Sequence, residues 1–114
     1  MNEALASIFE ECAKAPGALG CGVRLPDRTS RVRSFDRECP GESIEKALLH
    51  LTSTVALLSS QDLVGHHLTW AFAAGKLHVA IRNDGALFCL AVRKDAGGVE
   101  FCEGMLGKFL ATVA

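Results

Sequence analysis

The segment of residues 64–92 constrains the fold of this chain most strongly. Apolar residues alternate along it with small or polar ones in three runs, which is the side-chain pattern of strands. Gly75 and Gly85 fall in the two short connections, where a hairpin loop usually needs a residue that accepts positive φ. The segment therefore predicts an antiparallel meander with strands at residues 64–73, 77–82 and 87–92.

Four-residue loops at both glycines set a strand register that the hydrophobic pattern supports. In this register Trp70 pairs with Val79, and Val79 pairs in turn with Leu90. All large apolar residues then share one face, and a one-residue slip would scatter them. Small residues on the opposite face let a helix approach closely, so we expect helices on both faces of the sheet. That face carries His67, Thr69, Ala71, Ala73, His78, Ala80, Arg82, Leu87, Cys89 and Ala91.

Hydrophobic periodicity predicts three helices and a further hairpin around the meander. The helices run over residues 2–15, from Gly41 or Ser43 to Ser60, and over residues 98–113. The hairpin joins strands at residues 18–25 and 29–35 through a turn centred on Pro26-Asp27. The expected fold is α+β, a five-stranded antiparallel sheet with helices on both faces in the order α-β-β-α-β-β-β-α. We expect one domain over residues 1–114.

The second helix has more apolar surface than one neighbour can cover. Its main stripe, which we expect against the sheet, is Ile44, Ala47, Leu48, Leu51, Val55 and Leu58. A second and milder stripe consists of Leu49, Thr52, Ser53 and Ala56, and another helix could pack there closely. Hydrophobic residues make up 49% of the chain. These features predict self-association or a permanent partner.

Composition excludes several classes of function. The net charge of −1 gives no general attraction to nucleic acid, and no apolar run approaches the roughly 18 residues of a membrane span. Acidic residues precede any basic one, which is atypical of a signal peptide. Five widely spaced cysteines form no C-x-x-C pair and are expected to be small buried residues in a reducing cytoplasm. They are Cys12, Cys21, Cys39, Cys89 and Cys102.

No motif in the sequence indicates catalysis or a cofactor. Cys89 and His78 are the nearest candidates for a thiol dyad, because the predicted register places them on neighbouring strands of one face. His67 and His78 are expected to lie well apart along their strands, so they do not predict a metal site. We expect no catalytic residue, no bound metal and no cofactor.

Arginines crowd the first hairpin and form the strongest polar signal. They are Arg24, Arg28, Arg31, Arg33 and Arg37. We expect Arg24, Arg31 and Arg33 to share one face and to form a docking surface for an acidic partner. The alternative is a solvated edge with local ion pairs. Nucleic acid fits less well, because few aromatic residues accompany the arginines and Trp70 is assigned to the core.

Several segments together resemble the roadblock/dynein light-chain family. They are the first helix before Gly17-Ala18-Leu19-Gly20-Cys21-Gly22-Val23, the long second helix, the run from Trp70 to Val79, the strand pair around Asp84-Gly85 and the closing helix. The resemblance covers nearly the whole chain. It implies a homodimer, or a heterodimer with a paralogue, in which second helices pack together and third strands join the two sheets. The implied interface comprises Leu49, Thr52, Ser53, Ala56, His67, Thr69 and Ala71.

The family resemblance also implies a class of function. Bacterial members often regulate Ras-like small GTPases, and others are scaffold subunits without an active site of their own. The leading hypothesis is therefore a non-enzymatic dimeric regulator or scaffold that binds a Ras-like small GTPase. A second hypothesis is a small-molecule sensor of the profilin-like or PAS-like kind, with its pocket between the second helix and the small-residue face. A third is a thiol enzyme or redox switch built on Cys89 or Cys102.

Overall fold

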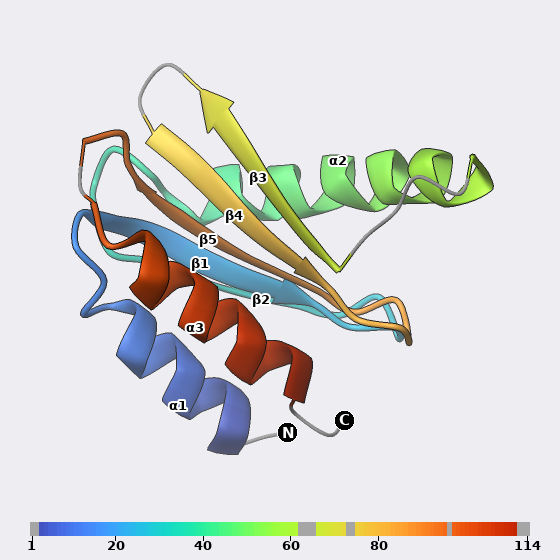
Figure 1. Cartoon of the computed structure of the whole chain (residues 1–114), viewed down its shortest axis with the longest axis horizontal. Helices are drawn as coiled ribbons and strands as arrows, with labels where there is room; N and C mark the ends of the chain where they lie inside the picture. The colour runs from blue at the N-terminus through green and yellow to red at the C-terminus, as the bar shows by residue number, and fades with distance from the viewer. Residues whose placement is uncertain (1–2, 62–65, 73–74, 96, 112–114) are drawn as a thin grey trace.

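The protein folds into one antiparallel sheet between two helical layers. The computed structural model describes residues 3–61, 66–72, 75–95 and 97–111. The elements follow the predicted order α-β-β-α-β-β-β-α (Figure 1). They are α1 (Glu3–Cys12), β1 (Ala18–Arg24), β2 (Ser30–Ser34), α2 (Gly41–Ser60), β3 (His67–Phe72), β4 (Gly75–Ile81), β5 (Leu87–Arg93) and α3 (Val99–Ala111). This confirms the expected α+β class.

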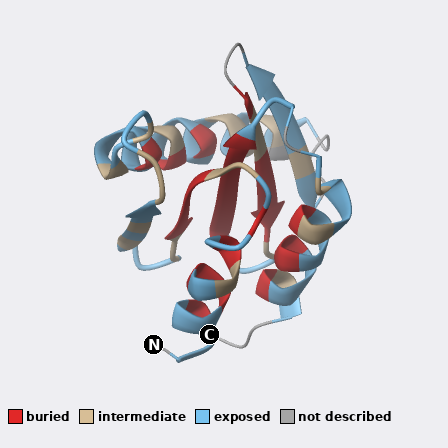
Figure 2. Cartoon of the chain, turned by 90° about the vertical axis from the view of Figure 1, so that its left-hand side faces the viewer, coloured by how far each residue is buried: buried red, intermediate tan, exposed pale blue. Residues whose placement is uncertain are grey.

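The sheet has the strand order β2-β1-β5-β4-β3, so β2 and β3 are its two edges. Helices α1 and α3 lie side by side on one face, and α2 crosses the other face (Figure 1). Two separate apolar clusters fill the spaces between these layers. Figure 2 shows that buried residues concentrate in the central strands and on the inward sides of the helices. Within the described residues, none of the helices has the length and hydropathy needed to cross a membrane.

The register between β4 and β5 differs from the prediction by one residue. Val79 pairs with Cys89 instead of Leu90. The connecting loop has three residues, because the amide of Arg82 donates to the carbonyl of Ala86, and Gly85 adopts a φ of 94°. A one-residue change reverses every side chain of the strand. The large residues of β5, which are Phe88, Leu90 and Val92, therefore pack in the cluster with α1 and α3, whereas Leu87 and Cys89 pack beside α2.

The first hairpin is shifted by one residue for a similar reason. Its loop is Pro26-Asp27-Arg28, and Arg28 has a φ of 73°, so the turn is longer than one centred on Pro26-Asp27. Val32 consequently pairs with Gly22, and its side chain lies on the α2 side of the sheet. The pairing of β3 with β4 is shifted by two residues, since Trp70 pairs with Leu77, and a two-residue shift leaves each side chain on its expected face.

Glycines in β1 allow α2 to lie directly on the sheet. A Cβ atom added to Gly20 would overlap with Cδ1 of Ile44, and one added to Gly22 would stand 2.8 Å from Cγ2 of the same residue. Leu48 is fully buried one helical turn further on. The helix is thus held over β1 and β2, and this position determines which part of the sheet it leaves uncovered.

Candidate interaction surface

The outer edge of β3 presents unpaired backbone groups. The amide of Ile81 donates to the carbonyl of His66 at 2.9 Å, which marks a hydrogen-bonded pair at the start of the β3–β4 ladder. Such pairs alternate with non-bonded ones along an antiparallel ladder. The backbone N–H and C=O groups of His67, Thr69 and Ala71 therefore point away from β4. No described strand lies on this side of β3, so the edge is open for pairing.

Apolar side chains of β3 remain exposed on the face that α2 occupies. Trp70 is 47% exposed and Phe72 is 43% exposed. The assignment of Trp70 to the core was therefore wrong. The hydrophobic pattern identifies the correct face of the strand, but α2 packs over β1 and β2 and does not extend its cover to the outer edge.

Within the C-terminal half of α2, the last turns continue beyond the strands (Figure 1). Leu57, in this half, is 65% exposed. His50 and Thr54 line a hollow that also contains Trp70, and Leu57 follows them at helical spacing. These residues form the flank of α2 that borders β3. We use the term α2–β3 surface for His50, Thr54, Leu57, Trp70 and Phe72 together with the open edge of β3.

The predicted interface residues divide between two places. His67, Thr69 and Ala71 lie on the open edge of β3 and are exposed. The stripe of Leu49, Thr52, Ser53 and Ala56 is also exposed, but helical geometry places it on the flank of α2 that faces away from β3. The structure therefore does not bring the two sets together. Sequence reasoning missed Leu57, Trp70 and Phe72 as surface residues, although Leu57 already lay outside both stripes.

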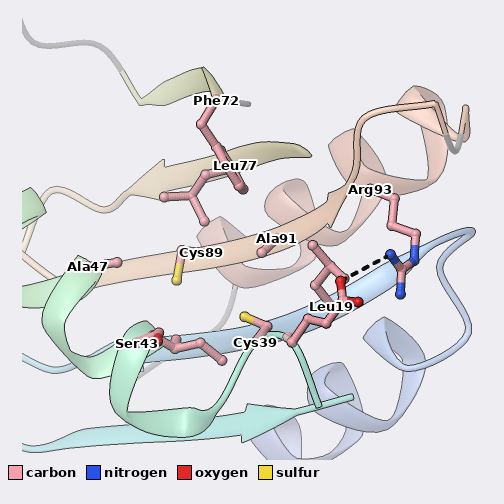
Figure 3. Close-up of a pocket in the computed structure, with 12 residues that line it drawn as sticks. Leu19, Cys39, Ser43, Ala47, Phe72, Leu77, Cys89, Ala91 and Arg93 are labelled. Atoms are coloured by element: carbon pink, nitrogen blue, oxygen red, sulfur yellow. Dashed lines mark ion pairs between the residues drawn. The ribbon is translucent and has the colours of Figure 1, made fainter. Parts of the chain in front are cut away.

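A mainly apolar cavity of about 390 Å³ lies between α2 and the sheet (Figure 3). The sequence predicted a pocket between this helix and the small-residue face, but that expectation was wrong for β4, because α2 packs on the side of Leu77 and Val79 and leaves Ala80 on the other. Leu19, Ala47, Phe72, Leu77, Cys89 and Ala91 contribute most of its apolar lining. At its polar end, Arg93 forms ion pairs with Asp36 and, at 3.7 Å, with Glu38. A smaller hollow of about 200 Å³ adjoins it along α2 and shares Ala47, Phe72 and Leu77. The two hollows are therefore neighbours along α2, separated only by residues that line both.

The cysteines provide no activated thiol in the described residues. Cys12, Cys21, Cys89 and Cys102 are buried, and Cys39 is half-buried; all five are free. Burial raises the pKa of Cys89 to about 12 and also raises the pKa of Cys102. The predicted Cys89–His78 dyad is wrong, because the one-residue shift of β5 puts Cys89 on the α2 face and leaves His78 on the other.

His67 and His78 lie closer together than the sequence predicted. Their ring centroids are 6.5 Å apart, because the two-residue shift of β3 makes them diagonal neighbours. His78 is buried, and burial, with smaller contributions from His67 and Lys76, lowers its pKa. Its Nδ1 lies 3.3 Å from Oγ1 of Thr69. The described residues contain no group of three possible metal ligands here or elsewhere.

The three arginines expected on one face are divided by the sheet. Arg24 pairs with Ser30 and lies on the α2 side, whereas Arg31 and Arg33 alternate onto the α1 side. The guanidinium of Arg33 lies 6.0 Å from the ring centroid of Phe9 in α1. The expectation of a shared face was therefore wrong, and only Arg31 and Arg33 form a pair.

Comparisons with known proteins identify the fold. No protein-family model and no curated protein match the sequence. The solved structure of MglB from Myxococcus xanthus matches with a TM-score of 0.70 at 9% identity, over 96% of this chain and 90% of that chain. MglC from the same organism matches with a TM-score of 0.65 at 18% identity, over 97% and 100%. A Roadblock/LC7 domain from Streptomyces avermitilis matches at 0.61 and 11%, over 90% and 85%. The chain therefore has the roadblock-like fold.

Proposed function

We propose that this protein is a non-enzymatic dimeric regulator or scaffold that binds a Ras-like small GTPase in the cytoplasm. The observation that supports this proposal most directly is the α2–β3 surface, where exposed apolar side chains adjoin an open strand edge. Exposure of Trp70, Phe72 and Leu57 to water does not stabilise an isolated domain. Exposed apolar groups that lie together in this way are typical of association sites. The roadblock-like fold supports the functional class, and free, mostly buried cysteines suit a reducing compartment.

The proposed dimer forms when β3 of one copy pairs with β3 of a second copy or of a paralogue. His67, Thr69 and Ala71 then supply the backbone hydrogen bonds across the two-fold axis. The projecting last turns of α2 reach over the partner's sheet, so that Leu57 and its neighbours cover Trp70 and Phe72. In this arrangement the flank of α2 that carries His50 and Thr54 lies at the centre of the dimer interface. The stripe of Leu49, Thr52, Ser53 and Ala56 remains available on the outer side of the helix pair, where a further partner can dock.

A pull-down in two nucleotide states tests the GTPase assignment. The protein serves as bait in lysate of its own source, supplied with either GDP or a non-hydrolysable GTP analogue. Recovery of a small GTPase in only one state is the expected result. Failure to recover a GTPase in either state would contradict the assignment. A Leu57→Glu bait provides the control, since it is expected to remain folded but monomeric, and it shows whether GTPase binding requires the dimer.

The cavity between α2 and the sheet favours a second candidate function, a sensor of small apolar molecules. Its volume of about 390 Å³ falls within the range of small-ligand sites, and it has a charged end at Arg93. A thermal-shift screen against metabolites tests this candidate. A hit that raises the melting temperature by several degrees should lose its effect in Ala47→Phe, because Ala47 lines the cavity and a larger side chain there would fill it. A hit that acts equally on both proteins would not be bound there.

A further inference from the structure

The opposite edge of the sheet, β2, has the features of a second binding site. The amide of Leu25 donates to the carbonyl of Thr29, and the amide of Phe35 donates to that of Leu19. These two bonds fix the phase of the β1–β2 ladder, so Arg31 and Arg33 bond to β1. The backbone groups of Ser30, Val32 and Ser34 consequently point outward, and no described strand lies beyond them.

The arginine side chains of β2 are not neutralised by the acidic residues nearby. None of the ion pairs found among the described residues involves Arg31 or Arg33. The carboxylate of Asp27 accepts hydrogen bonds from the amide and hydroxyl of Thr29. The carboxylate of Asp36 accepts from the Glu38 amide and pairs with Arg93. Asp27 and Asp36 are therefore already engaged, Glu38 pairs with Arg93, and neither β2 guanidinium has an ion-pair partner among the described residues.

A hollow of about 290 Å³ lies beside these arginines. Leu5, Ala6 and Phe9 of α1 form one wall, and β2 forms the other. Helix α1 packs on β1 and α3, which leaves this part of the sheet uncovered. The position of Arg33 over the ring of Phe9 holds one guanidinium at the edge of the hollow. Side chains of an added strand would thus find room next to both positive charges.

We propose that β2 binds an extended acidic segment of another protein as a sixth strand of the sheet. Peptide residues opposite Ser30, Val32 and Ser34 exchange backbone hydrogen bonds with the edge. The alternate residues lie opposite Arg31 and Arg33 and carry carboxylates into the hollow. A second copy of the chain is disfavoured as the occupant, because its own β2 would bring arginines against arginines. The proposal is independent of the GTPase assignment and of the dimer.

Binding of synthetic peptides tests this proposal. The probe is a blocked seven-residue peptide of alternating glutamate and valine, and the control replaces glutamate with lysine. We expect saturable binding of the glutamate peptide, with NMR amide shifts centred on residues 30–34, and at least roughly tenfold weaker binding of the lysine peptide. The double variant Arg31→Glu/Arg33→Glu should reverse this preference. Arg24→Glu should not, because Arg24 lies on the other side of the sheet.

Backbone methylation of the peptide separates strand addition from plain charge attraction. N-methylation of the valines removes the amides that face β2 and should abolish binding, whereas N-methylation of the glutamates should leave it nearly unchanged. Equal binding of both methylated peptides would overturn the proposal. So would an equal affinity for single-stranded DNA of the same charge, which would indicate an anion-binding surface, or amide shifts confined to β3.

Discussion

The two edges of one sheet have opposite chemical characters in this protein. β3 carries the half-exposed Trp70 and Phe72, and α2 leaves them uncovered. β2 carries Arg31 and Arg33, while the first turns of α2 lie on its other face. Both edges offer outward backbone groups, so hydrogen bonding alone cannot distinguish their partners. The side chains make the distinction, because apolar groups favour a matching apolar copy and like charges exclude one.

The position of α2 produces this difference. Gly20 and Gly22 let the helix lie close against β1, and its buried stripe of Ile44, Leu48 and Leu51 faces that side. The helix therefore covers one half of the sheet well and the other half poorly. The poorly covered half contains the α2–β3 surface and the smaller hollow that Trp70 and Phe72 line. We infer that close packing at one edge leaves the other edge dependent on a partner.

Loss of Trp70 should have the largest effect of the variants proposed here, and it acts on dimerisation through β3. Trp70→Ser should weaken dimerisation by about 2–4 kcal/mol, or roughly 30- to 1,000-fold, because large aromatic residues dominate interfaces. Analytical ultracentrifugation over a dilution series measures this. Leu49→Ser, on the far flank of α2, and Val99→Ser, on α3, remove similarly exposed apolar groups and should change the dimer constant by less than about threefold. If Leu49→Ser weakened the dimer as much as Trp70→Ser, the stripe of Leu49, Thr52, Ser53 and Ala56 would belong to the dimer interface after all.

Gly22→Val should have the next largest effect, and it acts on folding. A Cβ atom at this position already meets Ile44, Leu48 and Val32 at 2.8–3.1 Å, so the larger side chain must displace α2. We expect a loss of about 1–3 kcal/mol in the free energy of unfolding by urea. Ala71→Val, at an exposed position of β3, should stay within about 0.5 kcal/mol of the wild type. A similar loss in both variants would mean that the two edges are equally well packed.

The sequence predicts the elements of this fold far better than their registers. The order of helices and strands follows from periodicity, and the structure has the predicted order. The registers depend on loop length, and both three-residue loops were misjudged. One loop has Gly85 at positive φ, and a glycine in a short loop suggests such a conformation. The other has Arg28 at positive φ, which its residue type does not suggest. Each one-residue error moved a whole strand's side chains to the wrong face.

These register errors also made parts of the predicted site wrong. The predicted arginine face and the Cys89–His78 dyad both depended on registers that the loops changed. The exposure of Trp70 had a different cause, since its face was correct and only the extent of α2 was unknown. Periodicity identifies which side chains share a face, but it does not show how far a neighbouring helix covers that face.

A single charge on the edge of β3 should weaken dimerisation less than the loss of Trp70 does. Ala71→Glu places a carboxylate opposite Lys76 in the same chain, so the fold should tolerate it, but the proposed dimer brings two such charges to one interface. We expect dimerisation to weaken about three- to tenfold at low salt and to recover partly at 0.5 M NaCl. Ser30→Glu adds the same charge to the edge of β2 and should leave the dimer unchanged. An equal effect of both variants would place β2 in the dimer interface.

The smallest expected effect is a pH dependence of stability that comes from His78 of β4 and its neighbour His67 of β3. Burial, His67 and Lys76 lower the pKa of His78, while Glu103 of α3 opposes them. In the unfolded chain His78 takes up a proton near its ordinary pKa of about 6.5, but in the folded chain it does so only at a lower pH. The unfolded state therefore binds more protons in this window, and stability falls as the pH drops below about 6.5. Melting temperatures between pH 7.5 and 5.5 should decrease less in His78→Gln than in the wild type, and His67→Gln should give an intermediate slope. Identical slopes in all three proteins would show that the histidine pair does not couple the β3 edge to pH.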